Sequence, residues 1–291
     1  MFKAVVSDLD GTLISSSGEL TFKTLEAIKK IQNNGIKFVI LSGRRYEEIK
    51  SILIKYNLSC DVVGLNGAEF VYDNKRYISK DNIINEDLVK IISKCEMESI
   101  LYKVYSNKEI IFKEYDDIIY KLIELAKLYY NDVPSILICA YNLYNSICGN
   151  CIIESDIIDY LDQSKSKAFK IEVLSPIEKK LNIIRDEVMK CNDLNVTSSN
   201  SLNIEIMSKY IDKGQAVKRI SKVLGLDIKE IIGIGDNFND LAMFNNVGLS
   251  VAMGNAPEEI KKKVNYVTKT NDEDGIAEVI DRFILCAELS S

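Results

Sequence analysis

The strongest constraint on the fold of this chain is an apolar run that ends in two carboxylates. Residues 2–6 have the pattern of a short buried strand. Asp8 and Asp10 follow this run, and in extended backbone two side chains at this spacing point the same way. Two neighbouring anions repel each other unless a cation or a shared proton relieves the repulsion. Because Gly11 allows a sharp turn, this strand end can hold a nucleophile, an acid–base group and a Mg²⁺ ion.

The same arrangement recurs at two other places in the chain. Apolar runs at residues 36–41 and 231–235 each end at polar residues beside a glycine. The polar ends contain Ser42, Gly43 and Arg44 after the first run, and Asp236, Asn239 and Asp240 after the second. Ligands bind outside the carboxyl ends of the strands in open parallel α/β sheets. We therefore expect these strand ends to meet at one edge of a sheet and to form a site.

Alternating strand and helix patterns at both ends of the chain predict the fold class. Residues 1–82 and 209–291 alternate in this way. The helices expected there span residues 20–34, 46–56, 213–224 and 275–285. This order favours a doubly wound α/β core, in which a parallel sheet carries helices on both faces.

The middle of the chain, residues 83–208, has a different pattern. Helical patterns occur at residues 86–95, 116–130 and 177–191, with short strands expected between them. A closing hairpin is expected through residues 198–202. We therefore expect residues 83–208 to form a separate α+β domain that is inserted into the core.

Composition restricts the class of protein. The formal net charge of −6 argues against a nucleic-acid or anionic-membrane surface. No apolar run approaches the roughly 20 residues that a membrane span needs, and the first strand leaves no room for a signal peptide. Seven scattered cysteines favour a reducing, cytoplasmic environment over a disulfide framework. The chain has no histidine, so acid–base chemistry has to use other side chains.

Two local patterns suggest other kinds of site. The run Gly233–Ile234–Gly235 resembles the start of a dinucleotide-binding loop, but the third glycine of that fingerprint is Phe238 here. Cys148 and Cys151 have the spacing of a zinc half-site or a redox pair, and no second cysteine pair or histidine completes four ligands. Both patterns are better explained by a strand end and by ordinary cysteines of the middle domain, and any role of the cysteine pair stays open.

Four motifs in order carry a resemblance to a known family. They are Asp8-Leu9-Asp10-Gly11-Thr12, Ser42 in Leu41-Ser42-Gly43-Arg44, Lys213 in Asp212-Lys213-Gly214, and Gly235-Asp236-Asn237-Phe238-Asn239-Asp240. Further matching stretches are Leu65-Asn66-Gly67-Ala68, Glu205-Ile206 and Ala252-Met253-Gly254-Asn255-Ala256. With these motifs the chain resembles the haloacid dehalogenase (HAD) superfamily, in particular its Cof-like subclass IIB sugar phosphatases. The resemblance implies a Rossmann-like core with an inserted α+β cap.

The resemblance also implies a reaction and a metal. Asp8 would attack phosphorus and form an aspartyl-phosphate, while Asp10 would serve as the general acid and base. Mg²⁺ would be held by the Asp8 carboxylate, the Asp10 carbonyl and Asp236, and Asp240 would orient the metal shell. The expected product is free phosphate from a small phosphorylated metabolite, with sugar phosphates as the expected substrate class.

Further residues are assigned to the phosphate or substrate by the same resemblance. Ser42 and Lys213 would hold phosphoryl oxygens. The other assigned residues are Gly43, Arg44, Asn66, Asn239 and Glu205. Lys213 opens a predicted helix, where a positive charge is favourable only if an anion binds nearby. Glu205 lies in the predicted cap, where it would contact the substrate or support a hinge.

Two alternatives stay open at this level. A phosphosugar mutase similar to phosphomannomutase would use the same pair of aspartates, and a non-catalytic regulator could retain the fold. Beyond the small phosphorylated metabolite we expect no nucleic-acid or membrane partner, and a monomer or a weak homodimer. The sequence leaves the individual substrate and the oligomeric state open.

Overall fold

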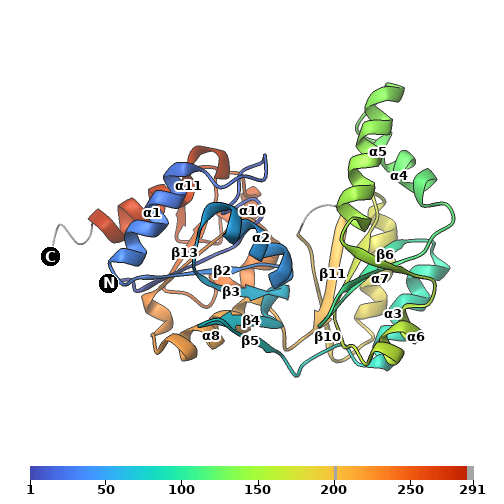
Figure 1. Ribbon diagram of the computed structural model, residues 1–291, viewed down its shortest axis with the longest axis horizontal. Coiled ribbons are helices and arrows are strands. Elements are labelled where there is room, and N and C mark those ends of the chain that lie inside the picture. Colours follow the sequence, from blue (N-terminus) through green and yellow to red (C-terminus); the bar gives the residue numbers. More distant parts are fainter. Residues whose placement is uncertain (200–201, 287–291) are drawn as a thin grey trace. The chain divides into compact units, whose positions relative to one another are not determined.

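The chain folds into two compact units. The computed structural model describes residues 1–199 and 202–286. Unit 1 contains Met1–Lys80 and Tyr210–Ser291, and unit 2 contains Asp81–Lys209 (Figure 1). The boundaries expected from the sequence, after residues 82 and 208, differ from these by two residues and one residue.

Unit 1 is built on an eight-stranded sheet, and the predicted parallel arrangement is confirmed. In spatial order its strands are β14 (Tyr266–Val267), β13 (Leu249–Ala252), β12 (Ile231–Gly235), β1 (Ala4–Ser7), β2 (Lys37–Leu41), β3 (Asp61–Gly64), β4 (Glu69–Tyr72) and β5 (Lys75–Ile78). Strands β14 to β3 run parallel, and Val5 of β1 lies between Ile232 of β12 and Phe38 of β2. Strands β4 and β5 add an antiparallel hairpin whose turn residues, Asp73 and Asn74, have positive φ.

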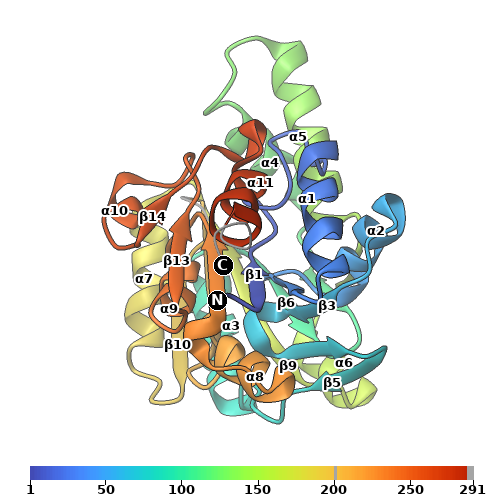
Figure 2. The same ribbon diagram turned by 90° about the vertical axis from the view of Figure 1, so that its left-hand side faces the viewer.

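Helices cover both faces of this sheet. They are α1 (Phe22–Asn33), α2 (Tyr46–Tyr56), α8 (Lys213–Leu224), α9 (Leu241–Phe244), α10 (Glu258–Lys261) and α11 (Gly275–Ile280). Figure 2 shows α1 and α11 on one side of the sheet and α8 and α9 on the other. Alternate residues of β1 explain this: Val5 packs into the core under α1, whereas Ala4 and Val6 pack into the core under α8. The final helix continues as a π-helical turn over Asp281–Leu285.

Unit 2 is built on a six-stranded, largely antiparallel sheet. In spatial order its strands are β10 (Leu194–Thr197), β11 (Asn203–Ser208), β9 (Ala168–Leu174), β6 (Leu101–Ser106), β7 (Ile110–Lys113) and β8 (Cys151–Glu154). Among the strand pairs that the structure describes in this sheet, β7 and β8 alone run parallel. The predicted closing hairpin joins β10 and β11, which pair antiparallel, but residues 200–201 of its turn lie outside the described residues.

The helices of unit 2 correct the sequence prediction in one region. The expected helices correspond to α3 (Asn85–Met97), α4 (Ile118–Ala126) and α7 (Glu178–Val188). Only short strands were expected between α4 and α7, but the structure has two more helices there, α5 (Val133–Cys148) and α6 (Ile157–Ser164). The prediction missed α5 because most of its residues are apolar and its polar residues, such as Ser135 and Asn142, occupy only a narrow side, which gives a weak one-sided period.

No helix in the described part of the chain combines the length and the apolar character that crossing a membrane requires.

Candidate active site

The carboxyl ends of four neighbouring strands bring the predicted residues of unit 1 together. Asp8 follows β1, Asp236 follows β12, Ser42 follows β2, and Asn66 lies just beyond β3. These strands are consecutive in the sheet, in the order β12-β1-β2-β3. The backbone N–H of Asp8 donates to the carbonyl of Ile234, which ties the start of the first motif to β12. The expectation that the strand ends meet at one edge is therefore met.

A buried lysine lies between two of the carboxylates. The Nζ atom of Lys213 is 2.6 Å from Oδ1 of Asp8 and 2.6 Å from Oδ1 of Asp240. Lys213 is the first residue of α8, whose N-cap Asp212 accepts a hydrogen bond from the N–H of Gln215. All three paired side chains are buried. This geometry fixes the Asp8 carboxylate from one side and the start of α8 from the other.

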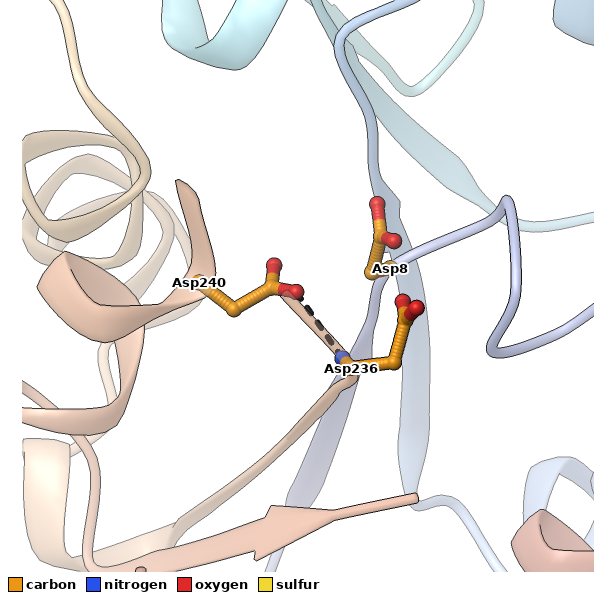
Figure 3. A group of neighbouring side chains, drawn as sticks. All are labelled: Asp8, Asp236 and Asp240. Atoms are coloured by element: carbon orange, nitrogen blue, oxygen red, sulfur yellow. Dashed lines mark hydrogen bonds between the residues drawn. The ribbon is translucent and has the colours of Figure 1, made fainter. Parts of the chain in front are cut away.

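A third carboxylate completes an acidic cluster. Asp8, Asp236 and Asp240 offer ligand atoms that all lie within 4.8 Å of one another, and Figure 3 shows their carboxyl groups gathered at one place. Oδ2 of Asp240 accepts hydrogen bonds from the N–H groups of Asp236 and Asn237, so Asp240 also shapes the loop that carries Asp236. When all four groups are ionised, the three carboxylates and the Lys213 ammonium carry a net charge of −2. A divalent cation would neutralise this charge.

The turn after Asp10 is shaped to leave room for Asp236. Gly11 has a φ of +73°, and a Cβ atom there would lie 2.5 Å from Oδ2 of Asp236. The Thr12 hydroxyl donates to Oδ1 of Asp236 at 2.8 Å, and the Asn255 amide donates to the Gly11 carbonyl at 2.8 Å. Glycine is therefore needed here for two reasons, the positive φ and the close approach of the Asp236 carboxylate.

Burial and mutual repulsion shift the titration of this cluster. Burial raises the pKa of Asp8 well above its ordinary value, and the negative charges of Asp240 and Asp236 raise it further. The positive charge of Lys213 acts in the opposite direction but does not cancel this rise. Burial and the Asp240 carboxylate raise the pKa of Asp236 to about 6. Burial alone lowers the pKa of Lys213, but its two carboxylate partners raise it overall. The cluster therefore holds protons more tightly than isolated carboxylates do.

Asp10 lies outside this buried cluster and pairs with Arg44. The Arg44 Nε–H donates to Oδ2 of Asp10 at 2.8 Å, and a second guanidinium nitrogen of Arg44 contacts Oδ1. Both side chains are partly exposed to solvent. The two predicted aspartates thus have different surroundings: Asp8 is buried against an ammonium, whereas Asp10 is held at the surface by a bidentate guanidinium.

The loop after β2 and the turn after β3 support each other. The Asn66 N–H donates to the Ser42 carbonyl and the Leu65 N–H to the Arg44 carbonyl, each at 2.9 Å. The Arg44 N–H donates to Oγ of Ser42 at 3.1 Å, and Gly43 lies between these two residues. Asn66 is buried and has a φ of +52°, an uncommon conformation for a residue with a side chain. Ser42, Gly43, Arg44 and Asn66 therefore form one connected group beside Asp8 and Asp10.

Asn239 lies in the 3₁₀ turn Phe238–Asp240, next to the acidic cluster. Its Oδ1 atom is buried and has no hydrogen-bond partner within the residues that the structure describes. A buried amide oxygen without a partner is uncommon in folded proteins. This oxygen is consistent with the predicted supporting role of Asn239 at a ligand.

Glu205, the remaining predicted residue, belongs to unit 2. It lies on β11, is buried, and its Oε1 is 3.0 Å from Nζ of Lys170 on β9. A second pair, Lys103 and Glu172, lies on the neighbouring strand positions at 3.1 Å. Burial on its own would raise the pKa of Glu172, but Lys103 and Lys170 lower it to about 2. One face of this sheet thus carries a charge-balanced polar network, while Val173 and Ile204 face the apolar core.

Two residues near the site were not identified as site residues from the sequence. Thr12 was only part of a motif, yet its hydroxyl holds Asp236. Glu69 is fully buried on β4. Its Oε2 accepts a hydrogen bond from the Tyr46 N–H at 2.7 Å, and its Oε1 forms an ion pair with Nε of Arg76 at 2.5 Å. Glu69 thereby fixes the start of α2 directly after the Arg44 loop. The available signal was a carboxylate within the largely apolar stretch 68–72, since a carboxylate needs a partner when it is buried.

Comparisons with known proteins agree with this geometry. The sequence pattern of a family described as haloacid dehalogenase-like hydrolase matches residues 5–280. The phosphatase YwpJ of Bacillus subtilis is 29% identical over 286 residues, which cover 97% of this chain and 100% of the relative. The 5-amino-6-(5-phospho-D-ribitylamino)uracil phosphatase YwtE of the same organism is 28% identical, with 97% and 98% covered. A solved structure of a haloacid dehalogenase-like hydrolase from B. subtilis aligns with a TM-score of 0.84 at 27% identity, covering 97% of this chain and all of the other.

Proposed function

The chain belongs to the haloacid dehalogenase-like hydrolase family, and from this premise we propose that it is a Mg²⁺-dependent phosphoric monoester hydrolase. Its substrates would be small phosphorylated metabolites, with sugar phosphates as the substrate class. The observation that carries the proposal is the buried Asp8 carboxylate, held by Lys213 and placed beside Asp236. A relative that is named as a phosphatase of a ribityl phosphate supports the choice of substrate class.

In the proposed reaction, the Asp8 carboxylate attacks phosphorus and the bond from phosphorus to the leaving oxygen breaks. Asp10 gives its proton to that oxygen, so a neutral alcohol leaves and an aspartyl-phosphate remains. Asp10, now a carboxylate, takes a proton from a water molecule as this water attacks phosphorus. Inorganic phosphate leaves, Asp8 is regenerated and Asp10 is protonated again. The bidentate contact of Arg44 orients the Asp10 carboxylate, the form that takes the proton from water.

The residues of the acidic cluster fit a Mg²⁺ ion. Asp8 and Asp236 are the proposed carboxylate ligands, together with the backbone carbonyl of Asp10. A bound Mg²⁺ would neutralise charge on the phosphoryl oxygens and relieve the repulsion within the cluster. Both carboxylate oxygens of Asp240 already accept hydrogen bonds from the chain. We therefore assign Asp240 the role of holding Lys213 and the Asp236 loop in place.

The phosphoryl group would be bound by the residues around Asp8. Ser42 and Lys213 would contact phosphoryl oxygens, whose charge spreads in the transition state. The connected backbone of Ser42, Gly43, Arg44 and Asn66 would fix the position of these donors. Asn239 would support the same pocket with its buried amide. Lys213 has a further effect. Its positive charge limits the rise in the pKa of Asp8 and so favours the ionised nucleophile.

Binding of Mg²⁺ should weaken in acid, because a proton on Asp236 competes with the metal. The pKa of Asp236 is raised from its ordinary value of 3.8 to about 6 in the folded chain. Below about pH 6 the apparent Mg²⁺ affinity should fall by at least about tenfold per pH unit, because the pKa of Asp8, the other proposed carboxylate ligand, is raised as well. Calorimetric titration with Mg²⁺ between pH 5 and 8 measures this. Equal affinity at pH 5 and pH 7.5 would contradict the assignment of Asp236 as a ligand.

The same shift has a consequence for stability without metal. The folded chain keeps the Asp236 proton up to about pH 6, whereas the unfolded chain releases it near its ordinary pKa. Between these pH values the folded state binds more protons than the unfolded state. Raising the pH through this window therefore lowers the contribution of Asp236 to the free energy of unfolding.

We propose that unit 2 acts as a cap that selects the leaving group, with Glu205 as one of the selecting residues. Glu205→Gln should change the ratio of kcat/KM between the best sugar phosphate and p-nitrophenyl phosphate by roughly tenfold or more. The Mg²⁺ dependence should stay unchanged, because the proposed metal residues lie in unit 1. Glutamine keeps the shape of the side chain and an oxygen that can accept from Lys170. Steady-state kinetics on both substrates measure the ratio.

The exposed Glu178 of α7 provides a matched control, since Glu178→Gln makes the same chemical change in the same unit. It should leave the ratio unchanged. If Glu205→Gln lowers kcat/KM on both phosphoesters by the same factor, the residue supports the fold or a hinge and has no role in selection.

The proposed function is tested by phosphate release from a panel of phosphorylated metabolites, with and without Mg²⁺. We expect Mg²⁺-dependent release of inorganic phosphate, highest for sugar or sugar-alcohol phosphates. Formation of an isomerised sugar phosphate in place of free phosphate would favour the mutase. The absence of both products across the panel would favour a non-catalytic regulator.

A further inference from the structure

The hairpin formed by α4 and α5 in unit 2 exposes an unusually apolar surface. Six of its residues, which we call the hairpin face, are Tyr129, Tyr130, Val133, Leu137, Ile138 and Tyr141. Each exposes between 45% and 67% of its surface. In Figure 1 the two helices lie side by side and extend beyond the end of the sheet of unit 2. The structure therefore leaves six large apolar side chains of one hairpin exposed to solvent.

Helix α5 carries two neighbouring apolar stripes. In the first, Ile136 and Ala140 pack against Leu122 and Ala126 of α4 in one buried cluster. In the second, residues 133, 137 and 141 are four apart and are exposed. A surface helix normally carries polar side chains outside the stripe that it buries. The exposed stripe of α5 thus has the composition of a covered surface.

The hairpin face supplies most of the area that one partner contributes to a stable contact. Six side chains of this size, each about half exposed, present on the order of 500–600 Å². This is the upper end of the range of roughly 300–600 Å² for the largest apolar patch on a monomer. One partner in a standard interface contributes about 800 Å², and the neighbouring atoms of the hairpin can supply the difference.

We propose that the hairpin face is the contact through which two copies of this chain form a symmetric dimer. Helix α5 contains no charged residue between Val133 and Cys148, although 27% of the whole chain is charged. Two copies that each carry a net charge of −6 repel each other, and this repulsion is smallest when they contact through a neutral surface. In a two-fold dimer the same patch faces itself, and an uncharged apolar stripe is complementary to its own copy.

Other occupants fit the hairpin less well. Residues 116–149 contain two lysines and four acidic residues, whereas a helix that lies on an anionic membrane is rich in lysine and arginine. The stretches of the chain outside the described residues, 200–201 and 287–291, are too short to cover the face of a helical hairpin. A second copy of the chain is the occupant that the charge and the size of the face favour.

The proposal is tested by sedimentation equilibrium of the full chain between 1 and 100 µM. We expect a monomer–dimer equilibrium in this range. The double variant Leu137→Glu/Tyr141→Glu should weaken association at least about 100-fold, because four carboxylates would be buried without partners in the dimer. Met97→Glu is the matched control, since Met97 is 78% exposed on α3 of the same unit and should leave the dimer unchanged.

Circular dichroism and thermal melting establish that the variants keep their fold. Hydrogen exchange of the unmodified chain gives a second readout that needs no variant: amides of residues 133–148 should become better protected as concentration rises. A parent protein that stays monomeric at 100 µM would overturn the proposal, as would a dimer that persists in the double variant. Binding of the monomer to neutral lipid vesicles through this face would overturn it in favour of a lipid surface.

Discussion

An Asp8→Asn variant is expected to lose phosphatase turnover by roughly 10⁴ or more, the order of loss when a nucleophile is removed, while keeping its fold. An amide cannot form the acyl phosphate that splits the reaction into two steps. The fold should persist because Lys213 keeps its 2.6 Å contact with Asp240. The raised pKa of Asp8, caused first by its burial, also indicates that the folded chain tolerates a neutral side chain there. Phosphate release and thermal unfolding measure the two expectations.

Asp61→Asn is the matched control for this variant. Asp61 lies at the beginning of β3, and burial raises its pKa as well. The same carboxylate-to-amide change at the start of a strand, away from the strand ends that carry the site, should leave turnover unchanged. Substantial hydrolysis by a well-folded Asp8→Asn protein would refute the assignment of Asp8 as the nucleophile.

Asp10→Asn should slow turnover by roughly 10²–10⁴, the usual contribution of a positioned acid or base. Asparagine cannot protonate the leaving oxygen or accept a proton from water, but its carbonyl oxygen can still accept from Arg44. Because the proposed metal contact of residue 10 is its backbone carbonyl, Mg²⁺ affinity should change little. Steady-state turnover and calorimetric titration with Mg²⁺ separate these two effects.

Asp236→Ala provides the comparison, since this change removes a proposed carboxylate ligand and the partner of the Thr12 hydroxyl. It should weaken Mg²⁺ binding far more than Asp10→Asn does. If Asp10→Asn lost Mg²⁺ binding as severely as Asp236→Ala, the proposed division of roles between the two aspartates would be wrong.

The sequence predicted the parallel sheet and the family because both depend on short local patterns. Asp8, Ser42 and Asp236 each follow an apolar run, and strands β1, β2 and β12 place these runs side by side. The family predicted from the motifs is confirmed by the family match across residues 5–280. Local patterns of this kind can be recognised without knowing which residues far apart in the sequence contact each other.

Contacts between distant residues explain what the sequence did not reveal. Arg44 was assigned to the phosphate, but its pairing with Asp10 depends on how two strand ends approach each other. The role of Glu69 at the start of α2 likewise depends on the pairing of β3 with β4. In unit 2, Glu205 was identified by motif alone, and its partner Lys170 follows from the register of β9 and β11.

The most direct test of the central claim is a rapid-quench experiment with a substrate that carries a labelled phosphoryl group. The proposed mechanism predicts transient, Mg²⁺-dependent label on the peptide that contains Asp8, at a rate that matches the formation of the alcohol product. The label should be absent from the Asp8→Asn variant. Release of labelled phosphate at the full rate with no label on Asp8, or with label on another residue, would contradict the mechanism.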